Sequence, residues 1–553
     1  MEFMTREIQT NQIGKKLVDQ FMLDEDYNVP DSKRDVQRLV VSDGKVKIDE
    51  VKRVENYIRV SGKLEFQILY VGEGFEPSLC SLEGKIPFEE MIYTEDMSGT
   101  YEVKNTRVEM QATMIHSRKL RIRAMVELEM GSEKQIIEDM PTDIECSTPL
   151  YKKKKPLDLL KLYTSKRDTY RIKEEITLPG TKETIGNMLW TDIANRKMDT
   201  KLGVDELQIL GELLVFCFYE SPEGKIDWIE QIVPYQGRVE CYGADGSMYH
   251  QVHANLEDVA ADIRMDEDGE VRVIGIEGTL KLSIAIYEEE HLDVLEDVYS
   301  LEKQCKLEKK EVCYEQLILQ NHSKCKVTER LTLPELKNDI LQICHSSGDV
   351  QVDHVEVTDQ GIIVEGVLHI GFLYVKASDE VPFDTWQGVV PFSYLIECKD
   401  VSAEMHYHIS SILEQLSIGL LGGDEVEVKA VLAFHCFFRK AVKAEMIADL
   451  KLESIDMNEL EKRPGVIGYI VKDGDDLWSL AKRFYTTMDG ICEVNELSDE
   501  KLKVGDRILI FKENMSILYT RYKRNTKNAE VFLTYGRRKQ DGAQLRIKGP
   551  CQN

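Results

Sequence analysis

The chain has 553 residues, of which 42% are hydrophobic and 31% are charged, and its formal net charge is −28. This composition is typical of globular domains, excludes a disordered or fibrous chain, and leaves room for three or four domains. The acidic charge disfavours a general nucleic-acid binder, because phosphate backbones attract basic surfaces. The first residues lack the apolar core of a secretory signal and no run approaches about 18 apolar residues, so we expect a cytoplasmic protein without a membrane span.

Three segments share one pattern, in which an apolar residue and a variable position precede a glycine and a strand that ends in tyrosine. The glycines are Gly62, Gly211 and Gly366, separated by 149 and 155 residues. A proline stands 32 residues before each glycine, and a Pro-aromatic pair follows each strand. This period predicts three copies of one domain. The prolines are Pro30, Pro179 and Pro334, and the pairs are Pro87-Phe88, Pro234-Tyr235 and Pro391-Phe392.

Each copy is expected to be β-rich. In the first copy Leu64, Phe66 and Ile68 alternate with polar residues, which is the pattern of a strand with one face in the core. The matching strands of the second and third copies are apolar on both faces, so we expect them to pack against neighbours. The repeated glycine indicates a bulge or the close approach of another backbone rather than a catalytic role.

Two polar, charged runs, Lys152–Lys155 and Leu301–Glu311, are expected to be linkers between the copies. The segment from Lys512 to Asn553 has ten Lys and Arg residues against three acidic ones, and it is either a solvated tail or a dock for an acidic partner. The fold class expected is multidomain and mainly β, followed by a small α+β module of βααβ order. The expected domains are a first β-rich repeat with an N-terminal segment over 1–150, a second over 160–300, a third over 312–450, the βααβ module over 465–512 and the basic tail over 513–553.

The repeats contain no recognisable catalytic motif. Asp266–Glu270 resembles a calcium loop but lacks its first acidic ligand, so it is predicted to be a hairpin turn. Two histidine pairs, His250 with His253 and His406 with His408, occupy equivalent segments and are expected on surface strands or loops. The twelve cysteines show no paired spacing, so we expect reduced thiols, no metal site and no cofactor. The phosphate-loop, metalloprotease and nucleophile-elbow motifs are also absent from the sequence, which favours a protein that is not an enzyme.

The segment from Gly468 to Phe511 has the order strand, helix, helix, strand. Apolar residues recur at helical spacing from Leu477 to Phe484, and Asp475 or Asp476 can cap this first helix. The segment resembles the LysM family. The family's Gly-Asp-Thr-Leu-Trp motif, central Asn and final Pro-Gly-x-x-Leu correspond to Gly474–Trp478, Asn495 and Val504–Leu509.

The LysM resemblance implies a shallow groove between two loops, Asp473–Leu477 and Asn495–Val504, in which related modules hold N-acetylglucosamine polymers. Here Asp476 replaces the usual Thr and Val504 replaces the usual Pro. Six acidic residues on these loops make the expected rim acidic, which adds weight to protein binding without excluding sugar. The candidate partner- or glycan-binding residues are Asp473, Gly474, Asp475, Asp476, Leu477, Asn495, Glu496, Leu497, Val504 and Gly505.

Three such repeats ahead of a C-terminal LysM module resemble the SipL-like spore coat proteins of clostridia, with their SPOCS domains. The resemblance implies a non-catalytic coat-assembly adaptor, made in the mother cell and placed at the forespore surface. Its LysM module would bind a coat scaffold, the ATPase stage IV sporulation protein A, and its repeats would contact other coat proteins or a second copy. The alternative is a peptidoglycan- or N-acetylglucosamine-binding protein of the cell wall or cortex.

Overall fold

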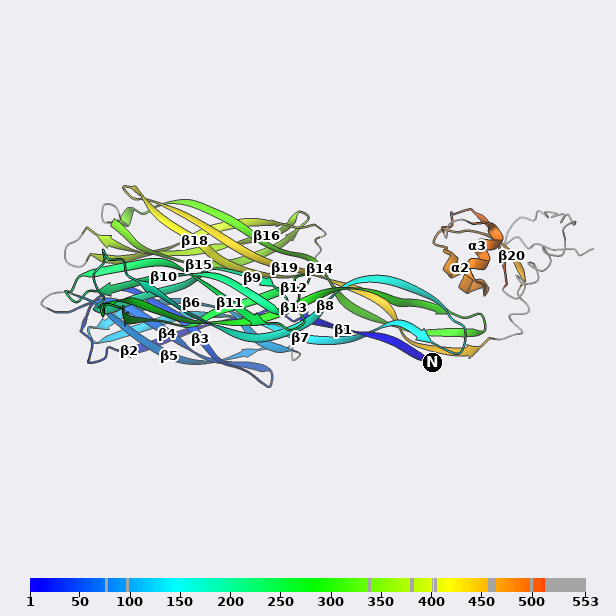
Figure 1. The fold of residues 1–553 in the computed structure, drawn as a ribbon, viewed down its shortest axis with the longest axis horizontal. Helices are drawn as coiled ribbons and strands as arrows, with labels where there is room; N and C mark the ends of the chain where they lie inside the picture. Colours follow the sequence, from blue (N-terminus) through cyan, green and yellow to red (C-terminus); the bar gives the residue numbers. More distant parts are fainter. Residues whose placement is uncertain are drawn as a thin grey trace, which may run out of the picture.

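The computed structural model describes residues 1–74, 78–95, 99–336, 340–377, 382–399, 401, 405–455, 464–497 and 501–512. The three repeats form a broad body that narrows into a stem, and the C-terminal module sits at the far end of the stem (Figure 1). The N-terminus also lies at the stem end. The predicted basic tail over 513–553 lies outside the described residues. No helix in the described part of the chain is long and apolar enough to cross a membrane.

The second and third repeats each consist of two three-stranded antiparallel sheets. In each sheet the central strand pairs with one strand on either side. The second repeat combines β12 (Tyr249–Met265), β13 (Val271–Tyr299) and β8 (Tyr151–Thr177) with β11 (Ile226–Glu240), β10 (Glu206–Glu220) and β9 (Asn187–Leu202). The third combines β14 (Lys303–Thr332), β19 (Glu425–Ser454) and β18 (Met405–Gly422) with β15 (Ile340–Thr358), β16 (Gly361–Lys376) and β17 (Phe383–Glu397).

The first repeat differs only in that its outer stem strand is divided. Two short strands, β1 and β2, pair with successive parts of one long strand, β7, whose other edge carries β6. The predicted mainly β fold is therefore confirmed in all three repeats. The strands are β1 (Glu2–Ile13), β2 (Leu17–Asn28), β7 (Lys119–Glu145) and β6 (Thr100–His116), with β3 (Val36–Val54), β4 (Tyr57–Gly72) and β5 (Ser78–Tyr93) in the second sheet.

The repeated glycine lies opposite the aromatic residue of the Pro-aromatic pair in every repeat. The cross-strand pairs are Gly62 with Phe88, Gly211 with Tyr235 and Gly366 with Phe392. A Cβ atom added to Gly366 would lie 2.0 Å from the carbonyl oxygen of Gln351, and one added to Gly62 would lie 2.4 Å from that of Lys47. The close approach of another backbone is thus confirmed at these two glycines, while at Gly211 the ring of Tyr235 fills the space.

Gly366→Ala is expected to lower the free energy of unfolding by about 1–3 kcal/mol, because the carbonyl of a neighbouring strand cannot move aside without distorting the sheet. Gly419→Ala in β18 is the matched control, since an added Cβ there meets nothing within 4 Å. Urea denaturation of both full-length variants checks the difference. Equal losses at the two positions would contradict the role assigned to the repeated glycine.

The three repeats share one hydrophobic core where their inner sheets meet. Leu69, Phe218 and Leu373 are equivalent, since they are separated by the same 149 and 155 residues as the glycines, and all three are buried in one cluster. A second equivalent trio in this cluster is Val40, Leu189 and Cys344. The predicted packing of the two-sided apolar strands against neighbours is confirmed. The three repeats are therefore arranged with approximate threefold symmetry around this core.

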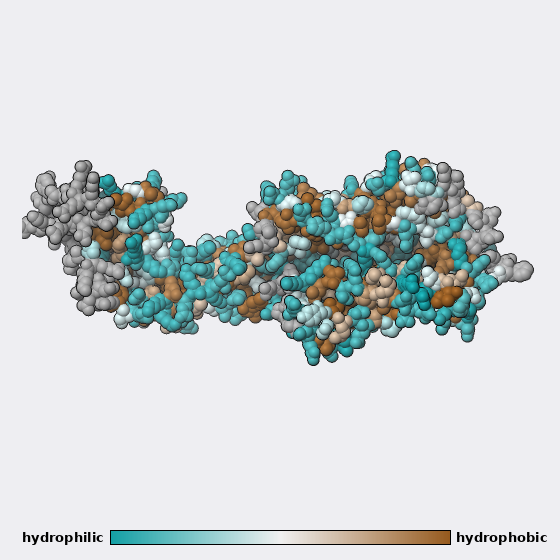
Figure 2. Space-filling view, turned by 180° about the vertical axis from the view of Figure 1, so that it is seen from behind, coloured by the Kyte–Doolittle hydropathy of each residue, from teal (hydrophilic) through white to brown (hydrophobic). Residues whose placement is uncertain are grey.

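The stem consists of three two-stranded ribbons, one from each repeat. β1 pairs with β7, β8 with β13 and β14 with β19, and the equivalent residues Ile8, Leu157 and Val312 meet in one buried cluster. The prediction that the polar runs are linkers is wrong: residues 152–155 lie in β8 and residues 303–311 in β14. Their polar composition has another cause, because in so narrow a stem most side chains face water, as Figure 2 shows.

The C-terminal module has the predicted βααβ order. Asp476 is the N-cap of the first helix, and Ser479 completes a reciprocal capping box with it. Leu477, Leu480 and Ala481 form the buried face of this helix, as expected. The elements are β20 (Val466–Ile470), α2 (Leu477–Phe484), α3 (Met488–Asn495) and β21 (Arg507–Phe511).

Candidate functional site

The C-terminal module is held against the end of the stem through α2. Asp297 of β13 accepts a hydrogen bond from Trp478 Nε1 at 2.8 Å and forms an ion pair with Lys482 Nζ at 2.6 Å. The hydroxyl of Tyr299 donates to the carbonyl oxygen of Thr486 at 3.0 Å, and its ring meets Trp478 edge to face at 4.9 Å. Tyr299 is buried in the core cluster of the module. The module and the second repeat therefore share one hydrophobic cluster, which fixes the direction in which the module faces.

Asp297 and Tyr299 were not identified from the sequence, although Asp297 has a periodic signal. Asp143, Asp297 and Asp449 are equivalent, separated by 154 and 152 residues, and each carboxylate accepts a hydrogen bond from the next backbone N–H. Only the second of the three contacts the module among the interactions of the described residues. The sequence therefore contained one signal for this contact, an aspartate that recurs at the same place in each repeat.

Asp297→Ala is expected to release the module from the stem, because it removes two hydrogen bonds to one charge, each contributing about 1.5–3 kcal/mol. Amide hydrogen exchange should become faster in α2 and around Thr486, with the body unchanged. Asp449→Ala is the matched control, since it removes the equivalent carboxylate from the third repeat. Unchanged exchange in α2 of Asp297→Ala would show that the contact does not hold the module.

The two loops predicted to form the LysM groove meet at their bases. The backbone N–H of Val471 donates to the carbonyl of Asp506, and the N–H of Gly505 donates to the carbonyl of Val471, both at 2.9 Å. Gly474 and Gly505 have φ values of +82° and +94°, so both turns depend on glycine. Among the described residues, no atom beyond the chain neighbours lies within 4 Å of a Cβ placed on either glycine, so both turns are open on this side.

The ten predicted groove residues divide into an exposed set and an internal set. Asp473, Glu496 and Val504 are exposed with the two turn glycines, and Val504 is 69% exposed. Asp475, Leu477, Asn495 and Leu497 form the internal set, whose side chains contact other parts of the chain. Asp476 is exposed but is grouped with them, because its carboxylate caps α2. The exposed set, which has two negative charges, is the candidate binding rim; residues 498–500 of the second loop lie outside the described residues.

The internal set stabilises the module itself. Leu477 is 1% exposed, and Leu497 packs against the same core. The amide of Asn495 bonds the carbonyls of Ile491 and Leu509 and the N–H of Leu509, all within 2.8 Å. In addition, the carboxylate of Asp475 accepts from Tyr469 and from the N–H of Lys472, and that of Asp476 lies 3.6 Å from Lys153 of the stem.

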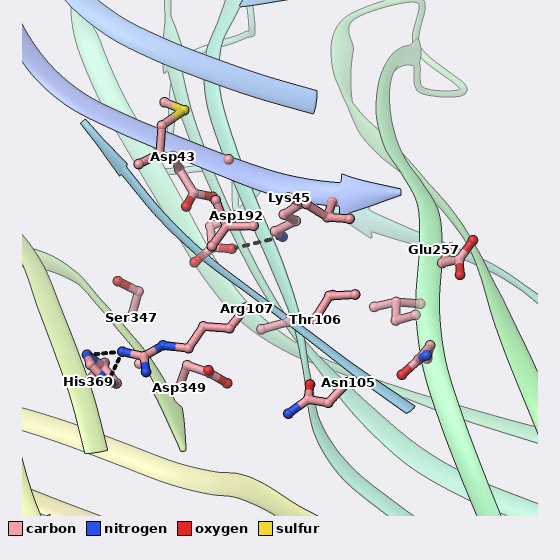
Figure 3. A pocket seen from close by; sticks show the side chains of 18 of the residues that line it. Asp43, Lys45, Asn105, Thr106, Arg107, Asp192, Glu257, Ser347, Asp349 and His369 are labelled. Atoms are coloured by element: carbon pink, nitrogen blue, oxygen red, sulfur yellow. Dashed lines mark hydrogen bonds and ion pairs between the residues drawn. The ribbon is translucent and has the colours of Figure 1, made fainter. Parts of the chain in front are cut away.

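A cavity of about 1450 Å³ lies in the body between the three repeats. Its walls carry both signs of charge, as Figure 3 shows: Lys45 lies 3.8 Å from Asp192, and Arg107 contacts His369 at 2.5 Å. Burial raises the pKa of Asp43, which projects from the same wall. Both contacts cross a boundary between repeats, because Lys45 and Arg107 belong to the first repeat, Asp192 to the second and His369 to the third.

His345 contacts a carboxylate through each of its two ring nitrogens. Its Nε2 lies 3.0 Å from Asp192 and its Nδ1 lies 2.6 Å from Glu230, while its ring stacks on Phe216 at 4.1 Å. Burial alone would lower the pKa of His345, but the hydrogen bonds and charges of the two carboxylates raise it above its usual value. Since His345 belongs to the third repeat and both acids to the second, this arrangement joins two repeats. It has the character of an interdomain ion pair rather than of an acid–base catalyst.

His253 of β12 and His408 of β18, both expected at the surface, lie between the repeats instead. Lys104, His253 and His408 are equivalent positions, again separated by 149 and 155 residues, and the two imidazole rings lie 6.5 Å apart. The Nε2 atoms of His253 and His408 are buried without a hydrogen-bond partner in the described residues. The surface prediction is therefore wrong for His253 and His408. His250 bonds Thr200 of its own repeat, and His406, whose side chain is 40% exposed, bonds Glu315 of its own repeat. The polar alternation of these strands could not reveal that a neighbouring repeat covers them.

Models of known protein families match both the three repeats and the C-terminal module. The family model of the SipL SPOCS domain matches residues 35–115, 184–264 and 339–421, and the LysM model matches residues 469–511. The chain therefore carries three SPOCS domains of the SipL type followed by a LysM domain. Domains of these two kinds are typically non-catalytic binding domains, and the SipL family is associated with morphogenesis of the spore coat. No curated protein and no solved structure matches the chain.

Each SPOCS match covers four strands of one repeat, from β3 to β6, β9 to β12 and β15 to β18. The ribbons that build the stem lie outside the matches. The aromatic residues opposite the repeated glycines lie inside them, so the Gly-aromatic contact belongs to the SPOCS unit. The resemblance to SipL-like proteins is therefore confirmed, and the stem is what joins the SPOCS units to the LysM domain.

Proposed function

We propose that the chain is a non-catalytic adaptor of spore coat assembly at the forespore surface in the mother cell. Its LysM domain binds a coat scaffold protein, an ATPase like stage IV sporulation protein A. The observation that carries this proposal is the placement of the LysM domain, docked by Asp297 at the end of a stem and away from the body (Figure 1). A domain fixed in this way presents one rim to a partner while the body is left for other contacts.

The charge of the rim favours a protein partner. Asp473 and Glu496 are exposed on neighbouring loops, whereas the polar side chains of Asp475 and Asn495 are used inside the domain. Exposed carboxylates attract a basic protein surface and increase the rate of encounter with it. A neutral glycan gains nothing from these charges, so the rim is better suited to a protein.

The three SPOCS domains supply the rest of the adaptor. Their shared core makes one body of three similar units, which offers related surfaces to other coat proteins or to a second copy. A second function, binding of peptidoglycan or N-acetylglucosamine, is favoured by the LysM match and by the two open glycine turns of the rim.

The charge of the rim provides the test. Asp473→Lys with Glu496→Lys in the full chain is expected to weaken binding to the purified scaffold ATPase at least about tenfold, which corresponds to about 1.4 kcal/mol. Glu267→Lys with Asp268→Lys in the β12–β13 turn gives the same change of net charge outside the LysM domain and should leave the affinity unchanged. Fluorescence anisotropy at two salt concentrations measures both. Equal weakening by the two double variants would reject the rim as the binding surface.

A further inference from the structure

Two histidines and an aspartate converge at the boundary between the second and third repeats. His322 lies on β14, His435 on β19 and Asp199 on β9, and one ligand atom from each lies within 4.8 Å of the others. The three residues are far apart in sequence and come from three strands of two repeats. Sequence spacing alone gave no indication of this cluster, because it shows no short-range ligand motif.

The two histidines are preorganised by the sheet. His322 and His435 are directly opposite each other in the antiparallel register of β14 and β19, and their ring centroids are 4.2 Å apart. Neither ring makes a hydrogen bond with any of the described residues. The nearest cation to Asp199 is Lys197, whose Nζ lies 3.7 Å from one carboxylate oxygen. Both imidazoles therefore keep nitrogen lone pairs available at a single point on the boundary.

The protonation of the cluster suits a metal ion. Burial, with a smaller contribution from His322, lowers the pKa of His435 to about 4, so this ring is neutral at neutral pH. A metal ligand must be unprotonated, and two imidazoles with one carboxylate are a common donor set for Zn²⁺ with water in the fourth position. Ligand atoms on one tetrahedral zinc ion lie about 3.4 Å apart, so small side-chain rotations close the cluster. His322 is exposed, which gives an ion access from solvent.

We propose that Asp199, His322 and His435 bind one divalent transition-metal ion of the zinc class, which ties the second repeat to the third. The ion has three protein ligands and stabilises the contact between two SPOCS units, because it binds only where β9 meets the β14–β19 pair. The site lies in the body, so it does not depend on the partner of the LysM domain. A metal ion that binds the folded chain alone raises its thermal stability by mass action.

Metal-stripped full-length protein, titrated with Zn²⁺ and followed by calorimetry, tests this site. The expected result is one ion per chain with a dissociation constant below about 10 µM. The midpoint of thermal unfolding should rise by at least about 2 °C in excess Zn²⁺. His322→Gln and His435→Gln should each weaken binding at least about tenfold and remove the rise.

His354→Gln is the matched control, because this exposed histidine lies on β15 away from the cluster and should leave Zn²⁺ binding unchanged. If His435→Gln does not fold, His322→Gln still tests the site. His322 is exposed, so its side chain can be replaced without disturbing the core. Binding weaker than about 100 µM would overturn the site. So would tight binding that persists in His322→Gln.

Discussion

Arg439→Ala is expected to lower the free energy of unfolding by about 3–5 kcal/mol, because it breaks a buried ion pair. Arg439 is 2% exposed, and its guanidinium forms an ion pair with Glu315 at 2.7 Å. It also donates to the hydroxyl of Tyr287 at 3.3 Å and to the backbone carbonyl of Asn11 at 3.4 Å. One side chain of the third repeat thereby contacts the first and second repeats, and its loss leaves a buried carboxylate without its cation.

The double variant Arg439→Met with Glu315→Leu separates the contribution of the ion pair to stability from the contribution of side-chain packing. Replacing both members of a buried pair by apolar residues of similar size is often neutral or stabilising, so most of the lost stability should return. Urea denaturation followed by near-ultraviolet circular dichroism measures all three proteins. A loss below about 1 kcal/mol in Arg439→Ala would contradict the role of this contact as the point where the repeats are joined.

The full chain is expected to lose stability as the pH falls from about 7 towards 4, and much of this loss should come from two histidines. Burial lowers the pKa of His253 to about 4 and that of His408 to about 3, against an ordinary value of 6.5. Between these values the unfolded chain binds protons that the folded chain does not. The stability is therefore complete above the ordinary pKa and is lost as the pH falls towards the folded pKa.

His408→Asn removes the titrating ring and should flatten the dependence of the unfolding free energy on pH over this range. His253→Asn should act in the same direction, and His354→Asn, at an exposed position, serves as the control. Guanidinium denaturation at intervals between pH 4 and pH 7 measures the slopes. An unchanged slope in both interior variants would show that these rings are not buried between the repeats.

The repeats themselves were predictable, because their spacing reflects contacts that recur in each one. The glycine and the Pro-aromatic pair, noted as separate motifs, are one contact across two strands, as Gly366 and Phe392 illustrate. The alternation of Leu64, Phe66 and Ile68 identified a strand with a core face. Similarly, the helical spacing from Leu477 identified α2, because the LysM core is made within the module. Local patterns sufficed where the interaction is local.

The contacts between the repeats were not predictable, because a single sequence does not show which polar face another repeat covers. Lys152–Lys155 reads as a hinge and is a stem strand. His408 reads as a surface histidine and is enclosed by the neighbouring repeat. Trp478 packs against the LysM core and also bonds Asp297, which lies 181 residues away in sequence. Within the predicted groove, the amide of Asn495 points inward and bonds Ile491 of α3 and Leu509 of β21, which the motif alone did not show.

The most direct test of the adaptor role compares two partners for the intact protein in one assay. Immobilised full-length chain is exposed separately to the purified scaffold ATPase and to purified peptidoglycan fragments, with the Asp473→Lys, Glu496→Lys variant on a parallel surface. We predict saturable binding of the ATPase that the rim substitutions weaken at least about tenfold. Binding of peptidoglycan alone, with no response to the ATPase, would contradict the adaptor role and favour a glycan-binding protein.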